Sequence, residues 1–231
     1  VDVEGSGQNT TTINCACSSN ALDASAAVIS AGAITAEIRH LTINNTGGGS
    51  QSGGVYTEGV ADGSFSMLHV TATATGSTFS YGVANHNSSS PSMNNVTATA
   101  TGNAFINYGV YNDDLSSPSM NNVTATATDG TNSYGVLNND SSPSMNNVTA
   151  TATDGTNDNA GVYNIASSPS IRNSSLAVGA AGTGISSSVF SDESSDTKLV
   201  YTELDGNVDG VGFTCVGAYT TDFAALGANC G

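Results

Sequence analysis

The sequence predicts an all-β protein, a right-handed three-sided parallel β-helix (solenoid) of about seven coils with about 26 residues each. Segments 92–101, 119–128 and 144–153 are identical, and segment 66–75 is a variant of them. Their methionines stand at 67, 93, 120 and 145, which gives intervals of 26, 27 and 25 residues. Each period contains three strand-like runs and no helix-length segment, so the coils are expected to be built from short strands alone.

The three runs of each coil are separated by turns rich in Gly, Asp and Asn. They read Pro-Ser-Met-Asn-Asn, Thr-Ala-Thr-Ala-Thr, and Tyr-Gly-Val-Tyr-Asn or a relative. A β-sandwich does not need near-identical sequence at a fixed period, and a β-propeller blade needs a longer period with four strands. The acidic, Ser- and Asn-rich composition is also compatible with disorder, but the strict period favours a solenoid with coils stacked about 4.8 Å apart.

Stacking is expected to place equivalent side chains in columns. Because strand residues alternate, the alanines of each Thr-Ala-Thr-Ala-Thr run should face the interior and the threonines the solvent. Two apolar columns follow, namely Met67, Met93, Met120, Met145 and Ile171, and Val55, Val83, Val110, Val136, Val162 and Ile185.

Two polar columns accompany the apolar ones. The first is expected to be a structural ladder inside the solenoid, at a bend, with ligand binding as the alternative: His40, His69, Asn95, Asn122, Asn147 and Asn173. The second closes the third strand of each coil: Asn85, Asn112, Asn138 and Asn164.

The repeats, together with segments 1–7, 169–174 and 198–219, carry a resemblance to known proteins. They are similar to the secreted bacterial right-handed parallel β-helix repeat proteins of the pectate-lyase-like superfamily. The resemblance covers almost the whole chain. It implies an exported protein at the bacterial surface or in the extracellular matrix, and it implies no defined activity because the family is mostly uncharacterised.

Residues 1–198 are expected to form the β-helix coils, and residues 199–231 a terminal coil with a cap closed by a Cys215–Cys230 disulfide. A short helix over residues 220–226 is expected within that cap. Cys15 and Cys17 are expected to be buried free thiols; a bridge to a neighbouring molecule and a distorted local bridge are the alternatives.

The charge excludes some partners. Three basic residues against nineteen acidic ones leave a net charge of −16, so binding to nucleic acid is not expected. No apolar run is long enough for membrane insertion. The chain begins on what reads as the middle of a strand, so we expect that an N-terminal segment with a secretion signal has been removed. No cofactor is expected, although the charge allows Ca²⁺ at the Asp-Gly-Thr-Asn turns.

The outward threonines form a candidate surface-binding face. Their expected spacing is about 6.7 Å along a strand and about 4.8 Å between coils, which resembles the ice-binding faces of β-solenoid antifreeze proteins. Threonine is also a good strand former that needs no ligand on an exposed face. The candidate residues are Thr71, Thr73, Thr75, Thr97, Thr99, Thr101, Thr124, Thr126, Thr128, Thr149, Thr151 and Thr153.

The favoured function is an extracellular structural or surface-interaction solenoid that self-assembles head to tail into a filament or sheath. Ice binding through the threonines is one alternative. Polysaccharide binding through the column Tyr81, Tyr108 and Tyr134, or polysaccharide degradation, is another. We expect no enzyme, because no Lys or Arg lies between Arg39 and Arg172 and the repeats are uniform.

Overall fold

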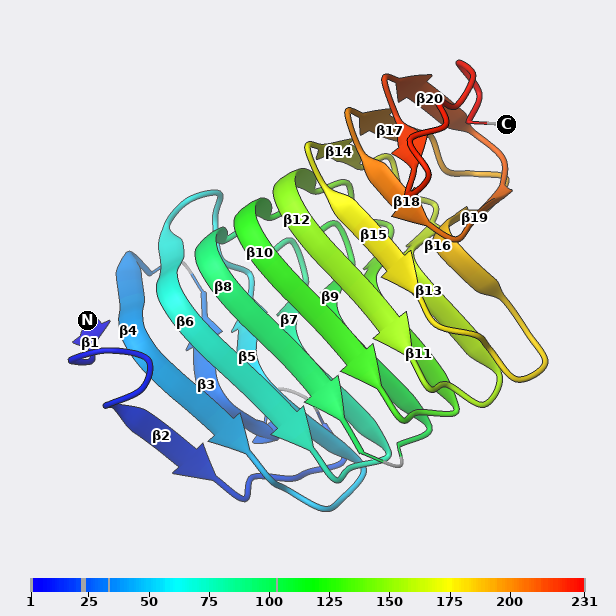
Figure 1. Cartoon of the computed structure of the whole chain (residues 1–231). Coiled ribbons are helices and arrows are strands. Elements are labelled where there is room, and N and C mark those ends of the chain that lie inside the picture. The colour runs from blue at the N-terminus through cyan, green and yellow to red at the C-terminus, as the bar shows by residue number, and fades with distance from the viewer. Residues whose placement is uncertain (1, 22–23, 33, 103, 231) are drawn as a thin grey trace.

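The computed structural model describes residues 2–21, 24–32, 34–102 and 104–230, which wind into a parallel β-solenoid of about seven turns (Figure 1). Its strands form a 13-stranded and an 8-stranded sheet, and each complete coil contributes to both. The front strands run downward in Figure 1 while the coils advance towards the C-terminus, so the winding is right-handed. The described residues contain no α-helix. The predicted fold class is confirmed.

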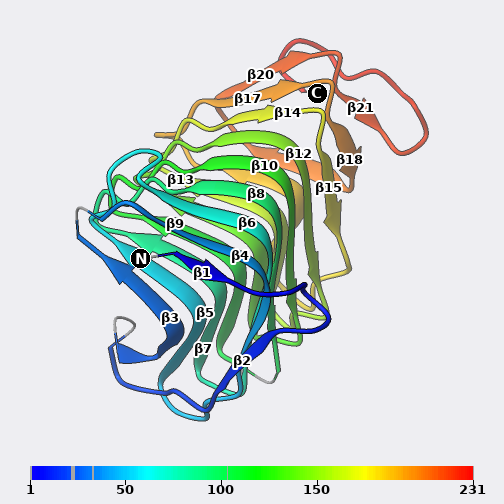
Figure 2. The same cartoon turned by 90° about the vertical axis from the view of Figure 1, so that its left-hand side faces the viewer.

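The 13-stranded sheet covers two sides of the solenoid because its long strands bend in the middle, as the view along the stack shows (Figure 2). The first two runs predicted for each coil are therefore one continuous strand. The long strands are β4 (Ala36–Asn45), β6 (Phe65–Thr75), β8 (Ser92–Thr101), β10 (Ser119–Thr128) and β12 (Ser144–Thr153).

Shorter strands complete this sheet at its two ends. Beyond β12 the bend splits each strand in two, giving β14 (Ser170–Arg172) with β15 (Ser175–Val178), and β17 (Thr197–Val200) with β18 (Glu203–Asp205). The remaining members are β1 (Val3–Glu4), β2 (Thr12–Cys15), β20 (Phe213–Val216) and β21 (Tyr219–Thr220).

The 8-stranded sheet forms the third side and contains the predicted Tyr-Gly-Val runs. Its strands are β3 (Ala26–Ala31), β5 (Gln51–Glu58), β7 (Phe79–His86), β9 (Ile106–Asp113), β11 (Asn132–Asn139), β13 (Asp158–Ile165), β16 (Ser186–Ser191) and β19 (Asn207–Gly210).

The interior is thin and apolar. The methionine column is fully buried in the predicted register, and the alanines of the Thr-Ala-Thr-Ala-Thr runs are buried as well. Gly82 lies so close to the opposite strand that an added Cβ would stand 2.5 Å from the Thr99 nitrogen, so only glycine fits there. The valine column is confirmed except at its last member. Val162 pairs with Val189, and the predicted Ile185 lies before β16.

The first polar column lies on the outside of the bend, which corrects the prediction that it lies inside. Each residue from His40 to Asn173 in that column has a positive φ between 49° and 55°. Asn tolerates this left-handed conformation better than most residues. The side chains are partly or fully exposed, and neighbouring amides bond each other, as from Asn122 to Asn95 at 3.2 Å. The column is a ladder, but it stabilises the outer corner.

The second asparagine column is the ladder inside the solenoid. All four amides are fully buried. Asn85 Nδ2 donates to Asn112 Oδ1, Asn112 to Asn138, and Asn138 to Asn164, each at 2.8 Å. The Thr57 hydroxyl donates to Asn85 at one end, and Asn164 donates to Thr197 at the other. Buried polar groups are stable only when they are bonded in this way.

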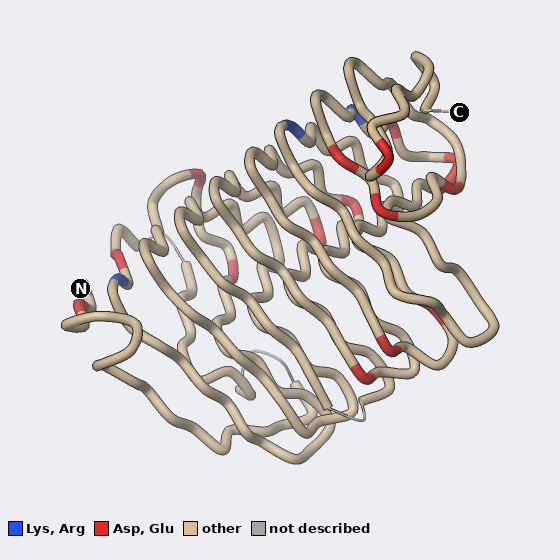
Figure 3. Tube along the Cα trace, in the orientation of Figure 1, with Lys and Arg blue, Asp and Glu red and all other residues tan. Residues whose placement is uncertain are grey.

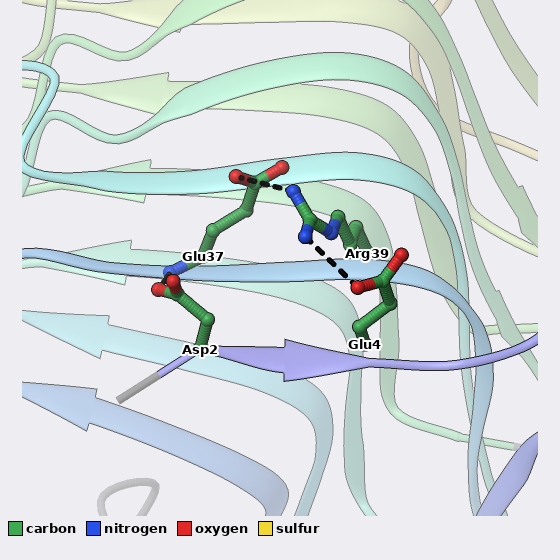
Figure 4. A network of polar contacts seen from close by, with 4 residues as sticks. All are labelled: Asp2, Glu4, Glu37 and Arg39. Atoms are coloured by element: carbon green, nitrogen blue, oxygen red, sulfur yellow. Dashed lines mark hydrogen bonds and ion pairs between the residues drawn. The ribbon is translucent and has the colours of Figure 1, made fainter.

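A network of polar contacts connects β1 to β4 in the first coil (Figure 4). Arg39 contacts Glu4 at 2.9 Å and Glu37 at 3.5 Å, and Asp2 accepts a hydrogen bond from the Glu37 backbone nitrogen at 2.9 Å. These side chains are partly or fully exposed, so each ion pair contributes little stability.

The cysteines form two local disulfides. Cys215 bonds Cys230, as predicted, with 5.4 Å between their Cα atoms. Cys15 bonds Cys17, so the prediction of two free thiols is wrong. The local bridge forms because β2 ends at Cys15 and the chain then leaves the extended conformation, which brings the two Cα atoms to 5.2 Å.

The predicted helix over residues 220–226 is absent. Tyr219 forms an antiparallel bridge with Ala225, and Phe223 has a φ of 59°, so the segment makes a tight turn that a right-handed helix cannot contain. Beyond that turn, the Cys215 nitrogen donates to the Ala228 carbonyl at 2.7 Å, so the C-terminal segment forms a hydrogen bond with the outer edge of β20.

We expect Asn112→Ala to lower the free energy of unfolding by about 2–4 kcal/mol, because it leaves one buried donor and one buried acceptor unpaired. Urea denaturation followed by circular dichroism measures the effect. Asn94→Ala, on the partly exposed outer surface, is the matched control and should change stability much less. Equal losses in the two variants would contradict a stabilising role of the inner ladder.

We expect Asn122→Gly to be tolerated at the outer corner and Asn122→Val to destabilise the protein by roughly 1–2 kcal/mol. The reason is the positive φ of 54°, which glycine adopts freely and a β-branched residue resists. Melting temperatures of the two variants check this order. If valine is tolerated as well as glycine, the corner conformation is not what selects the residue.

Candidate functional surfaces

The twelve predicted threonines form one flat array, called here the threonine face, on the outer side of β6, β8, β10 and β12. Strand pairing aligns Thr71, Thr97, Thr124 and Thr149 in one column and Thr73, Thr99, Thr126 and Thr151 in the next. Thr75, Thr101, Thr128 and Thr153 form the third, in which the Thr128 hydroxyl donates to Thr101 at 3.1 Å. Every member is partly or fully exposed.

Most hydroxyls on the threonine face are available to an external partner. Within the described part of the chain, no hydrogen bond uses the side chains of the first two columns. Only the third column bonds internally, where the Thr101 and Thr128 hydroxyls lie within hydrogen-bond distance of the Asp129 carboxylate, at 3.3 Å and 2.9 Å, and share their two protons among these contacts. Two columns therefore present donors and acceptors to the solvent at the spacing of the strands.

The chemistry of the array changes only at its ends. Thr42 and Thr12 extend the first column towards the N-terminus, whereas Ser175 and Glu203 replace threonine towards the C-terminus. Charged residues gather at the ends and along the turns, and the four long strands β6, β8, β10 and β12 carry none (Figure 3). The threonine face thus contains no charged residue, on a protein of net charge −16, although Asp129 borders its third column.

The outer side of the 8-stranded sheet carries aromatic side chains instead. The predicted column of Tyr81, Tyr108 and Tyr134 is in register, and the first two rings stack 5.0 Å apart. These residues are only 7–8% exposed, because Tyr111 and Tyr163 pack against them. The sequence prediction missed this covering column. The signal available in the sequence was the repeat of Gly-Val-Tyr-Asn at 109–112 and 161–164.

A pocket of about 390 Å³ opens on this sheet. Tyrosine rings line it together with acidic, imidazole and amide side chains: Gln51, Tyr56, Glu58, Tyr81, His86, Tyr111 and Asp113. Asp113 is held by His86 Nδ1 at 3.1 Å and by the Asn139 amide at 2.7 Å. None of these pocket residues except Tyr81 was a candidate in the sequence.

Burial sets the protonation of the tyrosines. It raises the pKa values of Tyr81, Tyr108, Tyr111 and Tyr134 well above the ordinary value, because a phenolate would lose its hydration there. Nearby carboxylates act in the same direction, with Asp113 beside Tyr111 and Asp158 beside Tyr134. The phenols are therefore neutral at ordinary pH.

The other candidate residues take structural positions. The His40 and His69 rings stack at 5.0 Å on the outer corner. Among the residues that the structure describes, no three His, Cys, Asp or Glu side chains are placed to hold a metal ion. Over the same residues, no helix has the length and apolar character needed to cross a membrane.

The fold and these surfaces define a parallel β-solenoid repeat protein. No protein-family model matches the chain, and no curated protein matches it. Two solved structures from Azotobacter vinelandii are similar in winding. The mannuronan C-5 epimerase AlgE4 A-module is 13% identical, with a TM-score of 0.47, and the match covers 98% of this chain and 76% of that one. The AlgE6 A-module is 15% identical, with a TM-score of 0.38 and coverage of 98% and 75%. Nothing about activity or site residues transfers at these values.

We expect alkali to destabilise the protein. The folded tyrosines have pKa values above the unfolded value near 10, so they add stability that is complete below pH 10 and lost as the pH rises through their folded values. Urea midpoints measured at pH 8, 10 and 11 should fall at the highest pH, and Tyr134→Phe should weaken that dependence. If absorbance at 295 nm shows the folded protein's tyrosines all ionising near pH 10, the buried cluster is wrong.

Proposed function

We propose that this chain is an extracellular surface-interaction solenoid, a rigid scaffold without catalytic activity that contacts its partner through the threonine face. The observation that carries the proposal is the repetition of the same hydroxyl columns in four successive coils, in strict register. Two disulfides support an oxidising, extracellular location, because reducing compartments disfavour them.

The physical properties of the threonine face suit a flat and repetitive partner. Threonine has a stiff, β-branched side chain, so little conformational entropy is lost when a partner orders it. Parallel pairing fixes the strands beneath, and no charged group interrupts the array. A surface with its own two-dimensional repeat can therefore meet many hydroxyls at once, each contact adding a small contribution.

The first candidate partner is the surface of an insoluble polysaccharide. Ice is the second, and the lattice geometry of the threonine face favours it. Columns about 6.7 Å apart and rows about 4.8 Å apart form a rectangular grid of hydroxyl and methyl groups. Such a grid can order water molecules at regular positions, since each hydroxyl is both a donor and an acceptor.

Head-to-tail assembly into a filament remains a prediction. At the C-terminal end, the segment that follows β21 already bonds an edge of β20, so a second molecule would have to displace it to continue the sheet there. We therefore propose that the contact with the partner lies on the threonine face and not at the C-terminal end of the stack.

The double variant Thr99→Tyr/Thr126→Tyr tests the proposal, because two bulky rings in the central column destroy its flatness. We expect wild-type protein to adsorb to insoluble cellulose or chitin, or to shape ice crystals and produce thermal hysteresis, and the variant to lose at least nine-tenths of that activity. Thr214→Tyr, on exposed β20, is the matched control and should keep it.

Two outcomes would contradict the proposal. The first is a wild-type protein that binds neither polysaccharide nor ice, and the second is a double variant that binds as well as the wild type. Release of unsaturated products from uronic-acid polymers would contradict the absence of catalysis.

A further inference from the structure

One column on the outer side of the 8-stranded sheet has a gap. Strand pairing places one outward residue in each of six successive coils, and five of the six are large and apolar. Ala84 is the exception, between two tyrosines. The column reads Tyr56, Ala84, Tyr111, Leu137, Tyr163 and Phe190.

Ala84 itself is fully buried, and the open space, called here the slot, is the cavity that the neighbouring tyrosines line. Tyr56 and Tyr111 belong to strands two coils apart, which corresponds to about 9.6 Å of stacking distance. Tyr81 supplies a third wall, with its ring 5.5 Å from that of Tyr111. The cavity of about 390 Å³ at this place has the size of a small-molecule site.

The rim of the slot is acidic. Glu58 and Asp113 line it from the coils on either side, and His86 lies between them in the same column. No Lys or Arg lines the pocket. The Glu58 carboxylate has no hydrogen-bond partner within the described part of the chain, whereas Asn139 and His86 hold Asp113 in place.

We propose that this slot binds an organic ammonium cation, such as a trimethylammonium group. Three tyrosine faces attract a cation through their ring quadrupoles, and such aromatic cages recognise alkylated ammonium groups. The two carboxylates add Coulomb attraction at short range, and the net charge of −16 raises the local concentration of cations while it repels anions. The alkyl groups fill the cavity that the three tyrosines line.

Isothermal titration calorimetry of the full chain with choline at pH 8 tests the proposal. Its neutral isostere 3,3-dimethylbutan-1-ol has the same shape without the charge. We expect choline to bind and the alcohol to bind at least tenfold more weakly. If choline does not bind, or if the alcohol binds equally well, the cation site is wrong.

Three variants locate the site. Ala84→Leu should abolish choline binding, because the larger buried side chain displaces the tyrosines that cover it into the cavity. The protein should still fold, because Leu137 occupies the equivalent position two coils later. Glu58→Gln should weaken binding at least tenfold, and Asp140→Asn, an exposed site with the same change in net charge, should leave it unchanged. Undiminished binding to Ala84→Leu would overturn the proposal. The variant Thr99→Tyr/Thr126→Tyr should still bind choline, so the failure of one proposal is distinguishable from that of the other.

Discussion

The in-register parallel pairing of each coil with the next is the constraint on which the rest of this molecule depends. It places identical residues above one another, so every side chain must tolerate a copy of itself about 4.8 Å away. Methionine and alanine do so by apolar contact, asparagine by amide hydrogen bonds, and threonine by standing side by side on a solvated face. Like charges cannot be stacked in this way without repulsion, and the long central strands carry no charge at all.

Much of the architecture could be predicted because the same residue pattern recurs in several coils. The period, the inward alanines, the outward threonines and the membership of both asparagine columns follow from spacing and alternation. The position of the first polar column did not follow. Strict alternation after an inward Met93 puts Asn95 inside, but its left-handed conformation turns the chain, so Val96 points inward instead. The positive φ at this corner of each coil therefore reverses which of the following residues point inward.

Features outside the regular repeats were harder to predict. Val189 takes the place of Ile185 in its column because it follows Val162 by 27 residues, the interval that also separates Val83 from Val110, whereas Ile185 follows by only 23. The pocket on the 8-stranded sheet is a gap between side chains of three successive strands, β5, β7 and β9. Such a gap is not visible as a motif, because it exists only after the coils are stacked. The threonine face, by contrast, is readable from one coil and its copies.

The inner asparagine ladder runs in one direction. Every amide donates to the next coil towards the C-terminus, and hydroxyl groups terminate the chain of hydrogen bonds at both ends. Because each internal rung is chemically the same, a whole coil can be gained or lost by duplication or deletion without leaving an unsatisfied amide. The molecule can therefore change its length in evolution by steps of one coil, while the hydroxyl-bearing ends stay as they are.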